Sequence, residues 1–300
     1  MMHKRLFLIT LLTLLSCKDY PGIPVPEVRA LRSIEPAALM AHINALAHDS
    51  MRGRGSGTAD EFRAAQYIEA QFKAMGYPRA ELVPFNVPPE KVGGQAEVVS
   101  RNVRAHLTGV PPLSAQTIVI GAHYDHVGVR SSFGTTTIFN GADDNASGVA
   151  VLIEVARLIA EHASNGGFGD APRRSLLFMA FGAEELGLVG SDFYCAHPHI
   201  PLWATTAMLN FDMVGRLRNR TLGVGGLSTS TVWSTIFAQQ NTEQLVIQAN
   251  DCNNCTDYAC FRQRGVPALW FFTGLHDEYH QPGDDPGLIN ADGLSDVADL

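Results

Sequence analysis

The chain has 300 residues and a mass of 32.5 kDa, and 46% of its residues are hydrophobic, so it can bury a sizeable core in one large domain or two small ones. Its formal net charge is -8, its isoelectric point is about 5.7, and the sequence carries no basic stripe. This charge balance argues against nucleic acid as a partner.

The first 16 residues are predicted to be a signal peptide. A basic start at residues 3–5 precedes an apolar run from Leu6 to Leu15 that is too short to cross a membrane. Cys17 follows Leu-Leu-Ser, which resembles the bacterial lipobox, in which the cysteine is lipidated and becomes the mature N-terminus. An ordinary secretory signal is the alternative. Residues 17–32 are proline-containing and are predicted to be an extended tether. We therefore expect export to the bacterial periplasm or cell envelope, with a lipid anchor at Cys17.

Residues 33–300 are predicted to form one domain. Apolar residues recur at helical spacing in residues 33–76, on both sides of the glycine-rich loop Arg52–Thr58. Residues 81–107 alternate enough to suggest two strands. Beyond them, short apolar runs typical of buried strands alternate with helical segments. The expected strands are residues 117–122, 175–181, 204–211 and 266–273, and the expected helices are residues 146–162, 187–196 and 231–240.

Buried strands separated by helices predict an α/β fold, with a mixed, mainly parallel central sheet flanked by helices. Residues 292–300 have helical spacing but no stop signal. We therefore expect the chain to end in the opening of a C-terminal helix that is truncated here.

Four cysteines follow the predicted signal peptide: Cys195, Cys252, Cys255 and Cys260. In an oxidising compartment, the three that cluster favour a local disulfide. A third metal site or a redox Cys-x-x-Cys pair is a weaker alternative, because neither a fourth nearby ligand set nor a thioredoxin-like context is present. The sequence leaves the pairing open.

Histidines and carboxylates follow the predicted buried strands. They are His123 and Asp125 after the first strand, Glu184 and Glu185 after the second, Asp212 after the third, His280 after the fourth, and Asp143 before a helix. Ligands of open α/β sheets bind beyond the carboxyl ends of the strands, and imidazole with carboxylate suits a divalent cation. Taken singly, each residue has an ordinary role, such as a turn residue or a helix cap. Taken together, they predict a metal site. We leave His126, His276 and Asp277 in ordinary roles.

Five motifs in order carry a family resemblance. They are Gly-Ala-His-Tyr-Asp-His at 121–126, Gly-Ala-Asp-Asp-Asn-Ala-Ser-Gly at 141–148, Ala-Glu-Glu-Leu-Gly-Leu-Val-Gly-Ser at 183–191, Asn-Phe-Asp-Met at 210–213 and Tyr-His-Gln-Pro-Gly-Asp-Asp at 279–285. The series resembles the co-catalytic zinc peptidases typified by bacterial leucyl aminopeptidases. Glutamate carboxypeptidases, glutaminyl cyclases and the transferrin receptor share the fold of this family.

The resemblance implies a site with two zinc ions. Asp143 would bridge both ions, His123 and Asp212 would complete one of them, and Glu185 and His280 would complete the other. The carboxylate of Asp125 would accept the second ring N–H of His123. The peptide bond between Asp143 and Asp144 would be cis, as it is in the family.

Glu184 is the general base that the resemblance implies, acting on a metal-bound water in the hydrolysis of peptides. Met213, Tyr279 and the Cys252–Cys255 loop would line the pocket for the N-terminal side chain. One motif departs from the family, because Thr256-Asp257-Tyr258 stands where Ser-Asp-His is common. Tyr258 either donates a hydrogen bond during the reaction or is a packed aromatic.

An exported aminopeptidase is therefore the leading hypothesis. A carboxypeptidase or dipeptidase on the same fold is an alternative, and it should place a cationic side chain near the site for the substrate carboxylate. Arg130, Arg216 and Arg262 are candidates for that role. A non-catalytic binding protein of the transferrin-receptor type is a further alternative, which the complete set of predicted ligands argues against.

Overall fold

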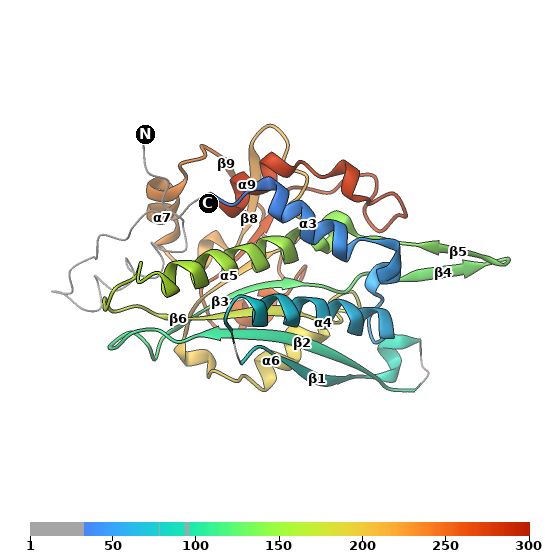
Figure 1. Ribbon diagram of the computed structural model, residues 1–300, viewed down its shortest axis with the longest axis horizontal. Coiled ribbons are helices and arrows are strands. Elements are labelled where there is room, and N and C mark those ends of the chain that lie inside the picture. The colour runs from blue at the N-terminus through green and yellow to red at the C-terminus, as the bar shows by residue number, and fades with distance from the viewer. Residues whose placement is uncertain (1–32, 78, 94–95) are drawn as a thin grey trace.

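The computed structural model describes residues 33–77, 79–93 and 96–300 (Figure 1). The predicted signal peptide, residues 1–16, and the predicted tether, residues 17–32, lie outside the described residues. Within the described part of the chain, no helix has the length and apolar character needed to cross a membrane.

The centre of the structure is an eight-stranded mixed sheet, with the order β1-β2-β6-β3-β7-β10-β8-β9. Its four central strands run parallel to one another. They are β6 (Ser175–Phe181), β3 (Thr117–His123), β7 (Thr205–Phe211) and β10 (Ala268–Phe272). The outer strands are β1 (Glu81–Val87), β2 (Val98–Leu107), β8 (Thr221–Gly225) and β9 (Val246–Ala249). Because β2 and β8 join the centre antiparallel, the mixed, mainly parallel sheet that the sequence predicts is confirmed.

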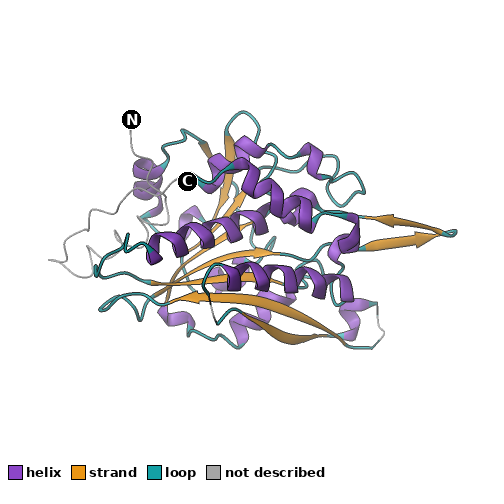
Figure 2. Ribbon diagram, in the orientation of Figure 1, coloured by secondary structure: helices purple, strands orange, loops and turns teal. Residues whose placement is uncertain are grey.

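Helices cover both faces of the sheet (Figure 2). Every residue of β3 and β6 is buried, as expected for strands packed on two sides. Successive side chains point to opposite faces. Accordingly, Ile118 and Ile120 pack into one core cluster while Val119 packs into another.

The larger core cluster includes buried residues of five helices. They are α3 (Pro36–Leu46), α4 (Ala59–Ala74), α5 (Gly148–Ser164), α7 (Trp233–Gln240) and α9 (Ala291–Ala298). The smaller cluster includes residues of α6 (Val189–Ala196) and α8 (Tyr258–Gln263). The helix α9 begins where the sequence predicts a helix to open.

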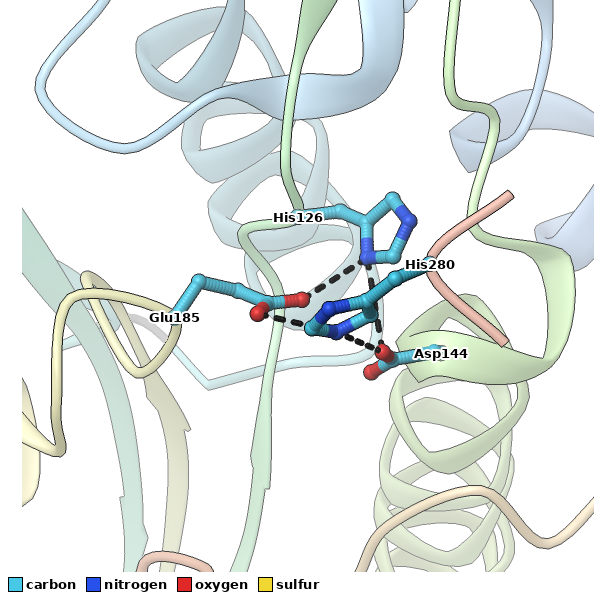
Figure 3. A group of neighbouring side chains, drawn as sticks. All are labelled: His126, Asp144, Glu185 and His280. Atoms are coloured by element: carbon cyan, nitrogen blue, oxygen red, sulfur yellow. Dashed lines mark hydrogen bonds and ion pairs between the residues drawn. The ribbon is translucent and has the colours of Figure 1, made fainter. Parts of the chain in front are cut away.

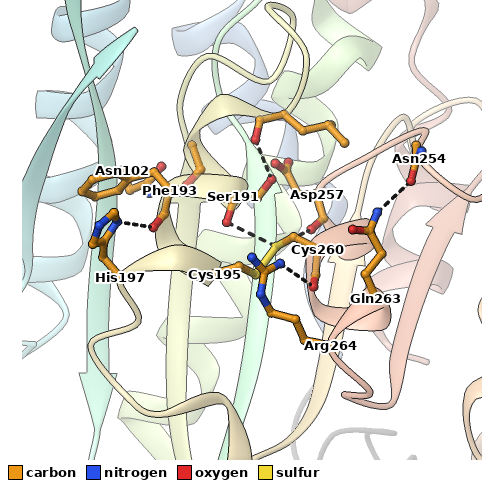
Figure 4. The surroundings of a disulfide bond; sticks show 12 residues. Asn102, Ser191, Phe193, Cys195, His197, Asn254, Asp257, Cys260, Gln263 and Arg264 are labelled. Atoms are coloured by element: carbon orange, nitrogen blue, oxygen red, sulfur yellow. Dashed lines mark hydrogen bonds between the residues drawn. A yellow bond between two sulfur atoms is a disulfide. The ribbon is translucent and has the colours of Figure 1, made fainter. Parts of the chain in front are cut away.

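Two disulfides lie on the side of the smaller cluster. Cys195 on α6 pairs with Cys260 on α8, with their Cα atoms 6.2 Å apart (Figure 4). Cys252 pairs with Cys255 across a short loop, with their Cα atoms 5.8 Å apart. The expected local disulfide is confirmed, and the pairing that the sequence left open is now fixed.

Several elements go beyond the sequence prediction. Strands β8 and β9 and helix α8 were not expected. A two-stranded hairpin, β4 (Val129–Ser132) with β5 (Thr135–Ile138), projects from the body of the fold (Figure 1). Both strands are short and mostly exposed, so the hairpin shows little hydrophobic periodicity in the sequence.

Candidate metal centre

A buried arginine fixes the loops that form the site. Arg54 has no solvent exposure and donates hydrogen bonds only to main-chain carbonyls. The carbonyls are those of Leu46, Tyr124, Asn140 and Gly141, at 2.7–2.9 Å. Burial lowers the pKa of Arg54 to about 10, so the side chain stays charged at neutral pH. One guanidinium thus links the end of α3, the loop after β3 and the loop before α5.

Asp144 occupies the centre of the site. Its Oδ1 atom lies 3.3 Å from Nε2 of His123. Its Oδ2 atom lies 3.0 Å from Nε2 of His280 and 3.5 Å from Nδ1 of His126. The two oxygens of one carboxylate therefore face two different sets of side chains, which is the arrangement of a residue that bridges two ions.

Two groups of candidate ligands flank Asp144. The first, which we call the His280 group, consists of His126, Asp144, Glu185 and His280 (Figure 3). The second, which we call the His123 group, consists of His123, Glu184 and Asp212. Within each group, one potential ligand atom from every residue lies within 4.8 Å of the others. In the His123 group, Nε2 of His123 is 3.3 Å from Oδ1 of Asp212.

Asp143, which the sequence analysis assigns as the bridge, lies outside both groups. Its Oδ1 atom accepts a hydrogen bond from the main-chain N–H of Gly215 at 2.6 Å, and its Oδ2 atom is 3.3 Å from Nε2 of His276. The turn Ala142–Ser147 is irregular, and adjacent side chains in it point in different directions. The prediction is wrong by one residue. Likewise, the cis peptide bond follows Asp144 and not Asp143.

His126 is the residue that the sequence analysis left in an ordinary role and that the structure brings into the site. Its Nδ1 atom is 2.8 Å from Oε1 of Glu185. Strand alternation places residues 123 and 126 on opposite faces. However, β3 ends at His123, and the chain then pairs at His126 with Gly55 outside the sheet. The turn after the strand brings both imidazoles to Asp144.

Asp125 supports the site differently from the prediction. The short contact of His123 Nδ1 is to the main-chain carbonyl oxygen of Asp125, at 3.2 Å, while the carboxylate Oδ1 atom is 3.8 Å away. The carboxylate accepts hydrogen bonds from the main-chain N–H groups of Glu184 at 3.0 Å and Glu185 at 3.3 Å. The hydroxyl of Ser56 donates to it as well. Asp125 therefore fixes the backbone that presents both glutamates.

Glu184 lies in a strongly acidic environment. Burial raises the pKa of Glu184 well above its usual range, and the charges of Asp212, Asp257 and Glu185 add to the increase, while His123 opposes it. Burial likewise raises the pKa of Asp257 to about 7. Asp257 belongs to the motif that departs from the family pattern, and its charge reaches the His123 group.

The residues present fit a pair of divalent cations. Four carboxylates, those of Asp144, Glu184, Glu185 and Asp212, and three imidazoles converge within the two groups. Buried carboxylates that face one another repel, and a bound cation removes that cost. Imidazole nitrogen and carboxylate oxygen are the ligands that zinc takes at hydrolytic sites.

Comparison with known proteins gives the family. The model of Peptidase family M28 matches residues 102–300, which is the part of the chain that contains both ligand groups. The chain belongs to peptidase family M28.

Two curated relatives of this M28 chain illustrate the similarity. It is 28% identical over 191 residues to aminopeptidase YwaD of Bacillus subtilis, covering 59% of this chain and 40% of that protein. It is 27% identical over 196 residues to leupeptin-inactivating enzyme 1 of Streptomyces exfoliatus, covering 65% of this chain and 37% of that protein. The alignment thus spans about two fifths of the length of these relatives.

Solved structures share the M28 fold. An aminopeptidase from Aneurinibacillus sp. strain AM-1 superposes with a TM-score of 0.70 at 20% identity, covering 89% of this chain and 92% of that one. A zinc aminopeptidase from Bacillus subtilis gives a TM-score of 0.71 at 18% identity, covering 91% and 94%. The glutaminyl cyclase of Porphyromonas gingivalis gives a TM-score of 0.68 at 19% identity, covering 89% and 96%.

The residues predicted to bind substrate in this M28 chain differ in their surroundings. Tyr279 is 38% exposed and stacks on the ring of His280, with the centroids 4.0 Å apart, so it lies at the open side of the His280 group. Met213 is buried and its main-chain N–H donates to Oδ1 of Asn145 at 3.2 Å.

Tyr258 packs in the protein interior. Its hydroxyl donates a hydrogen bond to the carbonyl of Cys252, and its ring centroid is 6.1 Å from that of Trp270 in the smaller core cluster. Of the two interpretations that the sequence left open, the structure therefore favours the packed aromatic. The assignment of Tyr258 as a substrate-binding residue stays a prediction.

Proposed function

We propose that this chain is a zinc metallopeptidase that removes N-terminal residues from peptides at a site for two metal ions. The observation that carries the proposal is the carboxylate of Asp144, whose two oxygens face separate imidazole and carboxylate groups. Membership of family M28 and relatives named as aminopeptidases support the reaction class.

The residues around Asp144 divide the work of hydrolysis between them. His123 and Asp212 would hold one ion, and Glu185 and His280 would hold the other, with Asp144 between them. Two bound ions acidify a water molecule and polarise the scissile carbonyl. Glu184 accepts the proton of the attacking water and delivers it to the leaving amine. Burial raises the pKa of Glu184, which strengthens the carboxylate as a proton acceptor.

The arginines near the site support an aminopeptidase over a carboxypeptidase. Arg216 is buried and contacts Asp284 at 3.1 Å. Arg130 lies over the ring of Phe139 at 4.7 Å, and Arg262 donates to Asn253 at 2.8 Å. Each of the three arginines that the sequence offered for a substrate carboxylate is thus engaged with another side chain. A free N-terminus then suits the acidic site better than a free C-terminus.

Matched peptides test the direction of cleavage. A set with free N-termini and the same set with acetylated N-termini are incubated with the metal-loaded protein, and the products are identified by mass spectrometry. We expect cleavage of the free set only, one residue at a time from the N-terminus. Cleavage of the blocked set from the C-terminus would show a carboxypeptidase instead. Bound metal without turnover on either set would favour the non-catalytic binding protein.

We also propose that the protein is exported and anchored by a lipid at Cys17, which rests on the basic start, the short apolar run and the Leu-Leu-Ser-Cys sequence. Labelled palmitate should be incorporated in a bacterial host that expresses the full chain. The Cys17→Ala variant should lose the label. A wild-type chain that stays unlabelled and is secreted in soluble form would contradict the anchor and leave the ordinary secretory signal.

A further inference from the structure

The His280 group contains one side chain more than the family resemblance assigns to it. Nδ1 of His126 lies 2.8 Å from Oε1 of Glu185 and 3.5 Å from Oδ2 of Asp144. Nε2 of His280 lies 3.0 Å from the same Asp144 oxygen and 3.1 Å from Oε2 of Glu185. Figure 3 shows the two imidazoles and the two carboxylates converging on one point.

These separations are close to those of ligand atoms around a single ion. Zinc binds imidazole nitrogen and carboxylate oxygen at about 2.0–2.2 Å, which places neighbours in a tetrahedron roughly 3.3–3.6 Å apart. In the His280 group one contact, of 3.5 Å, lies in this range, and the other three, of 2.8, 3.0 and 3.1 Å, are shorter. An ion could therefore enter after the side chains move apart by at most about half an ångström. An N–H group gives its one proton mainly to a single acceptor, whereas Nδ1 of His126 faces carboxylate oxygens of two residues.

A main-chain hydrogen bond and packing against Gly141 hold the ring of His126 in this orientation. The residue has no solvent exposure, and its main-chain N–H donates to the carbonyl of Arg54 at 3.2 Å. Gly141, with a φ of +60°, packs directly on the ring, where an added Cβ atom would come within 2.5 Å of Cδ2. Nε2 is buried without a hydrogen-bond partner among the described residues, so the polar contacts of the ring are made through Nδ1.

We propose that His126 is a protein ligand, through Nδ1, of the ion held by Asp144, Glu185 and His280. Four protein side chains then close that position. The other position, formed by His123, Asp212 and Asp144, keeps a coordination place for water, as catalytic zinc sites do. The inference rests on the proposed metal binding. The inference predicts different affinities for the two ions. The His280 group binds its ion more tightly, so the His123 group takes up its ion second and releases it first.

Cobalt titration tests this assignment without measuring turnover. Metal-free wild-type protein and the variants His126→Ala and His126→Asn are titrated with Co²⁺ while visible absorption is recorded, and affinities are obtained by competition with a chelator. Four-coordinate Co²⁺ absorbs several-fold more strongly than five- or six-coordinate Co²⁺. We expect an intense band at the first equivalent in the wild type. In both variants we expect a weak band, and affinity for the first ion at least tenfold lower.

The asparagine variant separates a ligand from a residue that only orients Glu185. Its amide can still donate an N–H from about the position of Nδ1, but the amide nitrogen does not bind metal, and the amide oxygen is a weaker ligand for Co²⁺ than imidazole. Recovery of the wild-type band and affinity in His126→Asn would therefore overturn the proposal. His42→Gln is the matched control, since His42 is buried on α3 against Tyr67 and Glu154, and its spectrum should equal that of the wild type.

The same titration distinguishes this inference from the proposed function. A wild-type protein that binds no Co²⁺ would overturn the metal site as a whole. A wild-type protein that binds two ions, with the first band unchanged in both His126 variants, would overturn the role of His126 alone.

Discussion

The two ligand groups on either side of Asp144 are built differently. The His280 group has two imidazoles and direct contacts of 2.8–3.5 Å between its members. The His123 group has one imidazole, and it includes Glu184, which retains some solvent exposure. A closed shell of protein ligands suits an ion that is held, and an open shell beside an acid suits an ion that acts on a substrate. In the proposed two-ion site, this difference would assign metal retention to the His280 group and chemistry to the His123 group.

Substitution of the shared carboxylate should have the largest effect, because both groups depend on it. In Asp144→Asn we expect metal binding to fall from two ions to one or none, and turnover to fall by more than for any other variant described below. Asp143→Asn is the matched control, because the amide oxygen can still accept from Gly215. Atomic absorption and peptide hydrolysis measure the two effects. Loss of metal in Asp143→Asn with retention in Asp144→Asn would restore the assignment made from sequence.

The Glu184→Gln variant should lose turnover while it keeps its bound metal. The amide cannot carry the proton, so we expect turnover to fall about 10²–10⁴-fold. Metal content should stay at the wild-type value, because the other ligands are untouched. Steady-state kinetics and metal analysis on the same preparation check this. A fully active variant would remove Glu184 from the role of base, and a variant that lost one ion would make it a ligand of the His123 group.

Asp125→Asn should affect both groups by a smaller amount. The substitution weakens the hydrogen bonds that hold the main-chain N–H groups of Glu184 and Glu185. We expect metal affinity or turnover to fall about 10–100-fold, as is usual for residues that orient ligands. Chelator competition measures the affinity. If only the His123 site weakened, the role of Asp125 would be confined to His123, as the sequence analysis expected.

A last effect, which does not involve the metal ligands, is expected on stability. Burial, followed by the charge of Asp125, raises the pKa of Glu61 to about 8, so its neutral form is favoured in the folded protein. Because the folded-state pKa exceeds the unfolded one, the free energy of unfolding should be greatest below pH 4.5 and fall as the pH rises towards 8. The slope from one such group is at most about 1.4 kcal/mol per pH unit.

Urea unfolding of the metal-free protein at several pH values, compared with Glu61→Gln, measures this contribution. The variant should show a flatter dependence between pH 4.5 and 8. Parallel curves for the two proteins would show that Glu61 is charged in the fold at neutral pH. In that case the hydrogen bonds from Ser100 and Gly57 outweigh burial.

The sequence predicted the elements whose hydrophobic signal is strong. Strands β3 and β6 are buried on both faces, and they begin and end within a residue of the prediction. Strand β9 and the β4–β5 hairpin are largely exposed, so apolar periodicity could not reveal them.

The site was predictable at the level of motifs but not at every residue. Spacing alone could not choose between Asp143 and Asp144, because the choice is made by an irregular turn in which the two carboxylates point apart. The sequence analysis also left His126 in an ordinary role, because no ligand role of the resembling family falls on it. The chain in fact leaves the sheet after His123, and pairing with Gly55 turns the imidazole towards Glu185.

Metal stoichiometry tests the central claim most directly. The protein is purified without chelator, loaded with zinc and dialysed against metal-free buffer. Zinc per chain is then determined by elemental analysis, with the protein concentration taken from amino-acid analysis. Two groups that share Asp144 predict two zinc ions per folded chain after zinc loading, with one lost before the other on stepwise chelation. A folded chain that takes up no more than one zinc ion under loading conditions would contradict the account.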